Sequence, residues 1–358
     1  MSLPELKVTK VIKSRLPDVD LNNLEFGKEF TDHMFEADFL GGIWTNIEIK
    51  PLQNLSIHPG NLAWHYGQSI FEGMKATVNK KGTPMLFRPE MHIKRLNASA
   101  ERMCMPALPE SLFFEAIENL VSLESNWIPK SEGSALYIRP LMFAIDECIG
   151  VRPSTNYKFL IMTLPVGPYY AKPVSLKVAD KYIRAAVGGV GEAKTAGNYA
   201  ASLYPAKLAN EQGFDQIMWL DAKEFKYIQE VGTMNIFFVV GNKIITPATD
   251  GAILKGITRD SAIKILRHEG YIVEEKPVEI NEIVKAYDAG TLTEVFGTGT
   301  AAVVAQVSKI GYNDVILSLK GDNTIGNIVK DKINKLRTGE LIDAWNWIKE
   351  VKTKELLV

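Results

Sequence analysis

The chain has 358 residues, more than one hydrophobic core usually accommodates, so we expect two domains. Hydrophobic residues make up 46% and charged residues 23%, which is ordinary globular usage and excludes a disordered chain. The formal net charge of −1 excludes a basic field that would attract nucleic acid or an anionic membrane. With only two cysteines, Cys104 and Cys148, and no apolar signal-peptide run at the N-terminus, we expect a cytoplasmic protein.

The first half of the chain predicts strands interleaved with two or three helices. Helical spacing of apolar residues marks 90–105 and 110–127, where Leu112, Ile117 and Val121 share a face. Runs rich in β-branched and aromatic residues predict strands at 42–52, 73–79, 84–89, 135–145 and 158–167.

A proline-rich segment, Pro165–Ser175, divides the chain, because prolines block helix continuation and remove strand donors. We predict a mixed α/β (α+β) fold of two domains, with a smaller N-terminal domain over 1–165, a linker over 166–176 and a larger, β-rich C-terminal domain over 177–358. A ligand would normally sit in the cleft between them. Beyond the linker we expect strands at 175–179, 216–221, 226–231, 235–240, 243–248 and 293–298, a hairpin at 308–319, and helices at 258–270 and 279–290.

Several common site motifs are missing. The five histidines show no paired ligand spacing, and no cysteine pair joins them, so we expect no zinc site. Neither a G-x-S-x-G elbow nor a G-x-x-x-x-G-K-[ST] loop occurs. Gly297–Ala302 matches G-x-G-x-x-A, but a hairpin rather than a long helix follows, which argues against a dinucleotide site.

Two charged residues are candidates for chemistry. Lys194 is surrounded by small residues, and although most loop lysines are surface charges, an imine-forming amine needs such open access. Glu230 lies in an apolar strand-rich run, either on a solvent face or aimed inward to pair with a buried cation.

Three elements could hold a phosphate. The turn around Thr298 and Thr300 offers hydroxyls and backbone N–H groups. A helix opening near Thr258 would present the N–H groups of Ile257 and Thr258, although Thr258 as a plain N-cap is the commoner outcome. Arg95 is the third, although such helix residues are more often solvated. An amine, a carboxylate, the tyrosine Tyr199 and a phosphate holder together suggest pyridoxal 5'-phosphate as cofactor.

With these residues in view, the chain resembles the branched-chain-amino-acid aminotransferases, the fold-type-IV, class IV pyridoxal-phosphate enzymes, over nearly its whole length. Seven blocks in family order carry the resemblance: "HYGQSIFEGMKA" (65–76), "LFRPEMHIKRLNASAERM" (86–103), "YIRPL" (137–141), "KTAGNYAAS" (194–202), "EVGTMNIFF" (230–238), "GITRDS" (256–261) and "GTGTAA" (297–302).

The resemblance implies a role for each matching residue. Lys194 would carry the cofactor, Tyr199 would bond its phenolic oxygen and Glu230 its ring nitrogen. The remaining cofactor contacts would be Arg95, Thr233, Ile257, Thr258 and Thr300. Substrate would meet Phe26, Tyr66, Phe71, Tyr137, Arg139, Tyr169, Thr233, Met234 and Ala301. Ile149 and Val151 would reach into a neighbouring subunit's pocket, which implies a homodimer.

The implied activity is reversible transfer of the amino group of L-leucine, L-isoleucine or L-valine to 2-oxoglutarate. Alternatives are a D-amino acid aminotransferase or an aminodeoxychorismate lyase of the same fold type, or a non-enzymatic protein that binds a phosphate ligand. Mammalian members carry a redox-sensitive C-x-x-C after the turn. Ala302 and Ala305 occupy those positions here, so we expect no such thiol switch.

Overall fold

The computed structural model describes residues 3–170 and 172–352, which form two compact units. The first unit extends through Tyr169 and also includes Ala193–Ala196 and the chain from Asn334 onward. Each unit has its own sheet and its own hydrophobic core, so the predicted two-domain α/β fold is confirmed.

The first unit contains a nine-stranded sheet. Its strands are β1 Lys7–Val8, β2 His33–Leu40, β3 Ile43–Pro51, β4 Ser69–Phe71, β5 Met74–Val78, β6 Pro84–Phe87, β7 Ala135–Ala144, β8 Tyr157–Val166 and β18 Ile348–Glu350. They lie in the order β1-β3-β2-β8-β7-β5-β6-β18, with β4 also paired to β7. Only β1 and β3 run parallel among these pairs.

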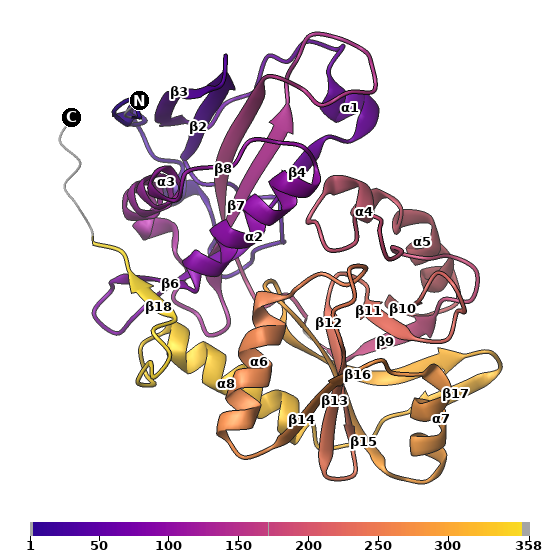
Figure 1. Ribbon diagram of the computed structural model, residues 1–358. Helices are drawn as coiled ribbons and strands as arrows, with labels where there is room; N and C mark the ends of the chain where they lie inside the picture. Colours follow the sequence, from indigo (N-terminus) through magenta and orange to yellow (C-terminus); the bar gives the residue numbers. More distant parts are fainter. Residues whose placement is uncertain (1–2, 171, 353–358) are drawn as a thin grey trace. The chain divides into compact units, whose positions relative to one another are not determined.

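Two long helices cover one face of this sheet (Figure 1). The unit's helices are η1 Leu16–Asp18, α1 Leu62–Tyr66, α2 Pro89–Arg102, α3 Glu110–Leu123 and η2 Ser125–Trp127. Leu96 of α2 and Leu120 of α3 pack in one core with Ile138 of β7. Because side chains alternate along a strand, Tyr137 and Arg139 of β7 point to the opposite face of the sheet.

A break in the strand pairing fixes Glu72 in the middle of this sheet. β7 pairs with β5 up to Ile138 and with β4 from Leu141 onward. Pro140, which has no N–H to donate, lies in the gap, and its carbonyl accepts the Glu72 N–H at 2.9 Å. Glu72 therefore lies between two strands, next to Gly73.

The second unit comprises Tyr170–Glu192 and Gly197–Ile333 and holds another nine-stranded sheet. Its strands are β9 Val174–Val178, β10 Gln216–Leu220, β11 Ile228–Val231, β12 Asn235–Val240, β13 Lys243–Pro247, β14 Ile272–Lys276, β15 Leu292–Gly299, β16 Val303–Tyr312 and β17 Val315–Ser318. The order is β11-β10-β9-β16-β15-β12-β13-β14, and β17 pairs with β16 as the predicted hairpin.

The remaining helices belong wholly or partly to this unit. They are α4 Ala196–Ala200, α5 Leu203–Glu211, α6 Ile257–His268, α7 Ile280–Asp288 and α8 Thr324–Arg337. Glu294 of β15 accepts the Ile325 and Gly326 N–H groups at 2.8 and 2.7 Å, and so caps α8. The last residues of α8 belong to the first unit.

The predicted domain limits are wrong in two places. Val166 belongs to β8 and Val174 opens β9, so the linker is shorter than 166–176; residue 171 lies outside the described residues. The chain from Asn334 onward belongs to the first unit, where β18 pairs with β6 and the Val351 N–H binds the Pro84 carbonyl. The first unit is therefore the larger one, contrary to the expected sizes. Among the described residues, no helix is long and apolar enough to span a membrane.

Candidate active site

An aromatic cluster surrounds Arg139 on the face of the first sheet that is opposite α2 and α3. The Arg139 Nη2 donates to the Tyr137 hydroxyl at 3.1 Å, and its guanidinium lies 4.8 Å from the centre of the Phe71 ring. Within the described part of the chain, the buried Arg139 Nε has no hydrogen-bond acceptor. A buried donor without an acceptor is costly, so this atom indicates a place for an anionic ligand.

Two further rings complete this cluster. Phe26 meets Tyr137 edge to face at 5.3 Å between ring centres, and Tyr169 at 5.0 Å. Burial raises the pKa of Tyr169, so its hydroxyl stays protonated at neutral pH. The structure thus brings together five of the predicted substrate residues, which come from four separate segments of the sequence. Tyr66 makes none of these contacts; it is on α1 and is 44% exposed.

Main-chain bonds attach the Lys194 segment to the first unit. The Lys194 carbonyl accepts the Phe71 N–H at 3.0 Å, and its own N–H donates to the Ser99 hydroxyl at 2.9 Å. Thr195 forms a β-bridge with Ile70. The Lys194 Nζ lies 4.8 Å from the Phe71 ring centre, at the aromatic cluster. The amine is therefore positioned by backbone that does not depend on its own side chain.

Arg95 is held by a buried carboxylate that the sequence did not single out. Its Nε and Nη2 donate to the two oxygens of Glu72 at 2.7 and 2.9 Å, and the Arg95 side chain is only 11% exposed. The interpretation of Arg95 as a solvated helix residue is wrong. His92 Nδ1 lies 2.7 Å from the same carboxylate.

Of the three side chains in this group, Glu72 and Arg95 are charged and His92 is neutral. Burial would raise the pKa of Glu72, but the Arg95 charge and the bonds from Arg95 and His92 hold that pKa well below its usual range. Burial lowers the pKa of His92, which is therefore a neutral ring donating its Nδ1–H to an ionised Glu72. The two bonds to Glu72 fix the plane of the Arg95 guanidinium, which has five N–H donors in all.

Glu230 lies in β11 of the second unit and is 3% exposed, so its placement on a solvent face is wrong. One carboxylate oxygen accepts the Leu254 N–H at 2.7 Å and the Asn235 amide at 3.4 Å. The other lies 2.9 Å from the Arg184 Nε. Glu230 thus pairs with a buried cation, which was the second of the two sequence-based interpretations.

The start of α6 is shaped to receive an anion. Gly256, not Thr258, is its N-cap, and no side chain caps this end. A Cβ at Gly256 would lie 1.9 Å from the Asn235 Oδ1, so only glycine allows this approach. Asn235 pairs with Thr298, whose buried hydroxyl finds no partner among the described residues. First-turn N–H groups backed by the helix dipole suit a phosphate.

The other predicted residues lie on turns and short helices. Tyr199 is half-buried in α4, Thr233 is exposed in the turn before β12, and Met234 is 5% exposed. Thr300 and Ala301 follow β15 in a turn. The structure does not test their roles, so these remain predictions, as does the placement of the active site between the two domains.

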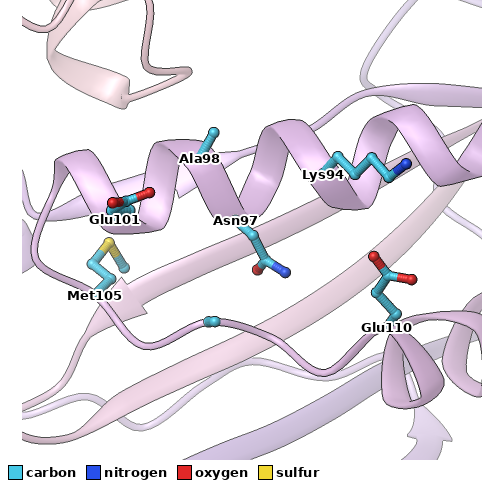
Figure 2. A pocket seen from close by; sticks show the side chains of 7 residues that line it. Lys94, Asn97, Ala98, Glu101, Met105 and Glu110 are labelled. Atoms are coloured by element: carbon cyan, nitrogen blue, oxygen red, sulfur yellow. The ribbon is translucent and has the colours of Figure 1, made fainter.

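A groove of about 560 Å³ on the first unit is a separate feature (Figure 2). None of the predicted site residues lines it, and the Asn97 amide in its wall binds both main-chain groups of Leu108. Its lining residues are Lys94, Asn97, Ala98, Glu101, Met105, Ala107 and Glu110. Within the described parts of the chain, no group of three or more His, Cys, Asp and Glu side chains could hold a metal.

Comparison with known proteins agrees with this arrangement. Residues 69–310 match the family described as amino-transferase class IV. Branched-chain-amino-acid transaminase 1 of Bacillus subtilis (strain 168) is 48% identical over 340 residues, which cover 93% of this chain and 95% of that protein. The chain belongs to the branched-chain family of class IV aminotransferases. The resemblance seen in the sequence is therefore confirmed.

Solved structures place the aminotransferase in the same fold. The branched-chain amino acid aminotransferase from Escherichia coli has a TM-score of 0.73 at 27% identity, covering 89% of this chain and 99% of that chain. The T.th. enzyme complexed with N-(5'-phosphopyridoxyl)-L-glutamate has a TM-score of 0.71 at 26% identity, covering 88% and 98%. Sequence reasoning missed Glu72, Arg184 and Asn235; the partners of the first two, Arg95 and Glu230, are distant from them in the chain.

Proposed function

We propose that this aminotransferase transfers the amino group of L-leucine, L-isoleucine or L-valine to 2-oxoglutarate, with pyridoxal 5'-phosphate as cofactor. The observation that supports it best is the Lys194 amine beside an aromatic cluster that contains one arginine. Such a cluster suits an apolar branched side chain, and the arginine suits the distal carboxylate of glutamate. The relatives described above are named for this activity, rather than for D-amino acids or lyase chemistry.

The residues present fit this cofactor. The start of α6, which no side chain caps, and the buried Thr298 hydroxyl, which has no partner among the described residues, suit a phosphate group. Arg95 would add a guanidinium that Glu72 holds in place. Glu230 would accept a bond from the ring nitrogen, and Tyr199 would donate to the phenolic oxygen. The T.th. structure contains a phosphopyridoxyl group joined to glutamate, which supports the same pairing of cofactor and substrate.

The chain's own residues would divide the work of proton transfer. When bound, pyridoxal 5'-phosphate supplies a ring that accepts electron density from the substrate Cα. The Lys194 amine, when uncharged, can take the Cα proton, and as an ammonium group it can return one. One side chain would therefore serve as base and then as acid, while backbone bonds hold its Cα in place.

A panel of amino donors tests the proposed function. Initial rates of L- and D-amino acids with 2-oxoglutarate should favour L-leucine, L-isoleucine and L-valine. A preference for D-amino acids would support the D-amino acid aminotransferase. A protein that gains no visible absorbance with pyridoxal 5'-phosphate would exclude an enzyme that uses this cofactor.

Arg139 should matter mainly for the dicarboxylic partner. We expect Arg139→Ala to lower kcat/KM for 2-oxoglutarate roughly 10- to 100-fold more than for leucine. This ratio corresponds to the loss of one hydrogen bond to a charged group, which contributes about 1.5–3 kcal/mol. Half-reaction rates with leucine and with glutamate measure this directly. Equal losses for both substrates would contradict a role in recognising the distal carboxylate.

Gly73 leaves room for the Tyr137 hydroxyl. A Cβ at Gly73 would lie 2.0 Å from that oxygen, so Gly73→Ala should displace the ring and break its bond with Arg139. We expect a higher KM for leucine and a stability loss of about 1–3 kcal/mol, measured by urea unfolding. Gly167→Ala is the control, because its Cβ would meet open space. An unchanged KM in the Gly73 variant would count against Tyr137 as a substrate residue.

We infer a homodimer from an apolar loop tip that is held out from the surface. Ile149 is 67% and Val151 89% exposed. Asp146 braces the loop by accepting the Thr155 and Asn156 N–H groups at 3.0 and 2.8 Å. Exposed apolar side chains on a braced loop suit burial against a second copy. Sedimentation analysis tests the inference of a homodimer.

We also propose a cytoplasmic location, which rests on the low cysteine content alone.

A further inference from the structure

Arg184 lies next to Glu230 in the second unit, and it is not one of the predicted site residues. Its side chain is 8% exposed, and its Nε lies 2.9 Å from a Glu230 carboxylate oxygen. Its Nη2 donates to the carbonyls of Gly191 and Ala252 at 2.9 and 2.6 Å. A buried arginine thus touches the carboxylate assigned to the ring nitrogen.

The backbone around Arg184 is built for close approach. A Cβ at Gly191 would lie 2.2 Å from the Ala252 carbonyl oxygen and 2.6 Å from the Ala185 Cβ. Only glycine therefore lets the two carbonyl-bearing segments converge on one guanidinium nitrogen. Because both carbonyls bind Nη2, they fix the guanidinium in one place, and the cation stays at Glu230.

The contact with Glu230 is one of charge rather than of a directed bond. Within the described residues, the Arg184 Nε makes no hydrogen bond, although it is 2.9 Å from the carboxylate. An oxygen that is not the target of the Arg184 N–H can still accept a bond from a ring N–H. Arg184 can therefore stabilise the negative charge without taking the place of the cofactor.

We propose that Arg184 is a positioning residue that keeps Glu230 ionised, so that the shared proton resides on the cofactor's ring nitrogen. This inference rests on the proposed function. A buried carboxylate without a cation takes up a proton, whereas a cation within about 4–6 Å favours its charged form. Arg184 would also repel a protonated ring, but its attraction for the Glu230 carboxylate acts over only 2.9 Å, and we assign the stronger effect to that attraction.

The test compares holoenzymes loaded with pyridoxal 5'-phosphate that carries ¹⁵N in the ring. The ¹⁵N signal separates the protonated from the unprotonated ring nitrogen, and it is followed against pH. In Arg184→Met we expect ring protonation to move to lower pH by about one to three pH units, and Arg184→Lys should restore most of the wild-type titration. The leucine half-reaction should slow in parallel.

Arg259→Met is the matched control. Arg259 is also buried in the second unit, donates to the Pro247 carbonyl at 2.9 Å and pairs with Glu275 at 3.0 Å. It should lose thermal stability as Arg184→Met does, yet keep the wild-type ¹⁵N titration. If the two variants shift the titration equally, or if Arg184→Met titrates like the wild type, the inference is overturned.

A second measurement tests the inference even if Arg184→Met binds the cofactor too weakly for the ¹⁵N experiment. In the protein without cofactor, Arg184→Met removes the cation beside the buried Glu230 carboxylate, so adding Glu230→Gln should recover part of the lost Tm. No recovery would overturn the inference. A wild-type protein that gives no ring-nitrogen signal refutes the proposed function and the inference together, whereas a normal wild-type signal with an unchanged Met variant refutes the inference alone.

Discussion

Replacing Lys194 with alanine should abolish amino transfer while leaving the protein folded. The two contacts that fix residue 194, to Phe71 and to Ser99, use its main chain, so alanine preserves both. The amine that accepts and returns the Cα proton is lost. Proton transfer by one positioned side chain typically contributes 10²- to 10⁴-fold. We expect the rate with leucine and 2-oxoglutarate to fall by at least about 10³-fold, since the same amine also carries the cofactor.

The control for this substitution is Lys207→Ala. Lys207 lies on α5, its side chain is 71% exposed, and it makes a 3.8 Å ion pair with Glu211 one turn away. It should retain wild-type rates and a wild-type Tm. Borohydride reduction of the wild type should leave a cofactor-modified peptide that contains Lys194. Modification of another lysine, or turnover by Lys194→Ala near the wild-type rate, would contradict the assigned role.

The strands and helices that the sequence predicted best are those whose pattern is local. The spacing of apolar residues in α2, α3, α6 and α7 matches the observed helices to within a few residues. β2 was missed because "HMFEADFL" contains no β-branched residue and carries two carboxylates, Glu36 and Asp38, whereas the strands were predicted from runs rich in β-branched and aromatic residues. Lys158 pairs with both carboxylates, and it lies more than a hundred residues away in the sequence.

In the C-terminal third of the chain, too, the sequence did not predict elements that depend on distant contacts. α8 was missed because "TIGNIVKDKINKLR" has a glycine at its third position, and glycine weakens the prediction of a helix. Its start is satisfied instead by Glu294, thirty-one residues earlier. β18, only three residues long, exists because it pairs with β6 at the edge of the first sheet. Such elements depend on tertiary contacts rather than on propensity.

In the candidate site, the sequence predicted the main residues but not the residues that hold them. The family motifs marked Lys194, Arg95 and Glu230, and the structure adds what holds two of them, Glu72 for Arg95 and Arg184 for Glu230. Glu72 and Arg184 are single charges in the short apolar runs "SIFEGM" and "YIRAAV". A lone charge in an apolar run is a usable signal, because burial requires a partner. Its partner, however, could not be chosen from sequence alone.

Replacing Glu72 with alanine should be the most destabilising of these substitutions. Glu72 is fully buried and accepts bonds from both Arg95 and His92. Its removal leaves a buried guanidinium without its carboxylate, and breaking a buried pair from one side costs about 3–5 kcal/mol. Because Arg95 also loses its orientation, the affinity for pyridoxal 5'-phosphate should fall as well. Urea unfolding and cofactor titration measure the two effects.

The pH dependence of this loss has a definite sign. The pKa of Glu72 is depressed in the folded protein, so its ionised form stabilises the fold above the ordinary carboxyl range. That contribution declines as pH falls through the ordinary value of 4.5 towards the folded value. The stability difference between wild type and Glu72→Ala should therefore be full at pH 7 and shrink below about pH 4.5.

A matched control separates this effect from the loss of any glutamate near α2. Glu101 lies on the same helix with an exposed side chain at the groove of Figure 2, and Glu101→Ala should change stability by no more than about 0.5 kcal/mol. Glu72→Gln keeps an acceptor for Arg95 but not the charge, so it should fall between wild type and Glu72→Ala. If Glu72→Ala were as stable as Glu101→Ala at pH 7, the ion pair with Arg95 would contribute nothing to the fold, and the bond network would have to serve orientation alone.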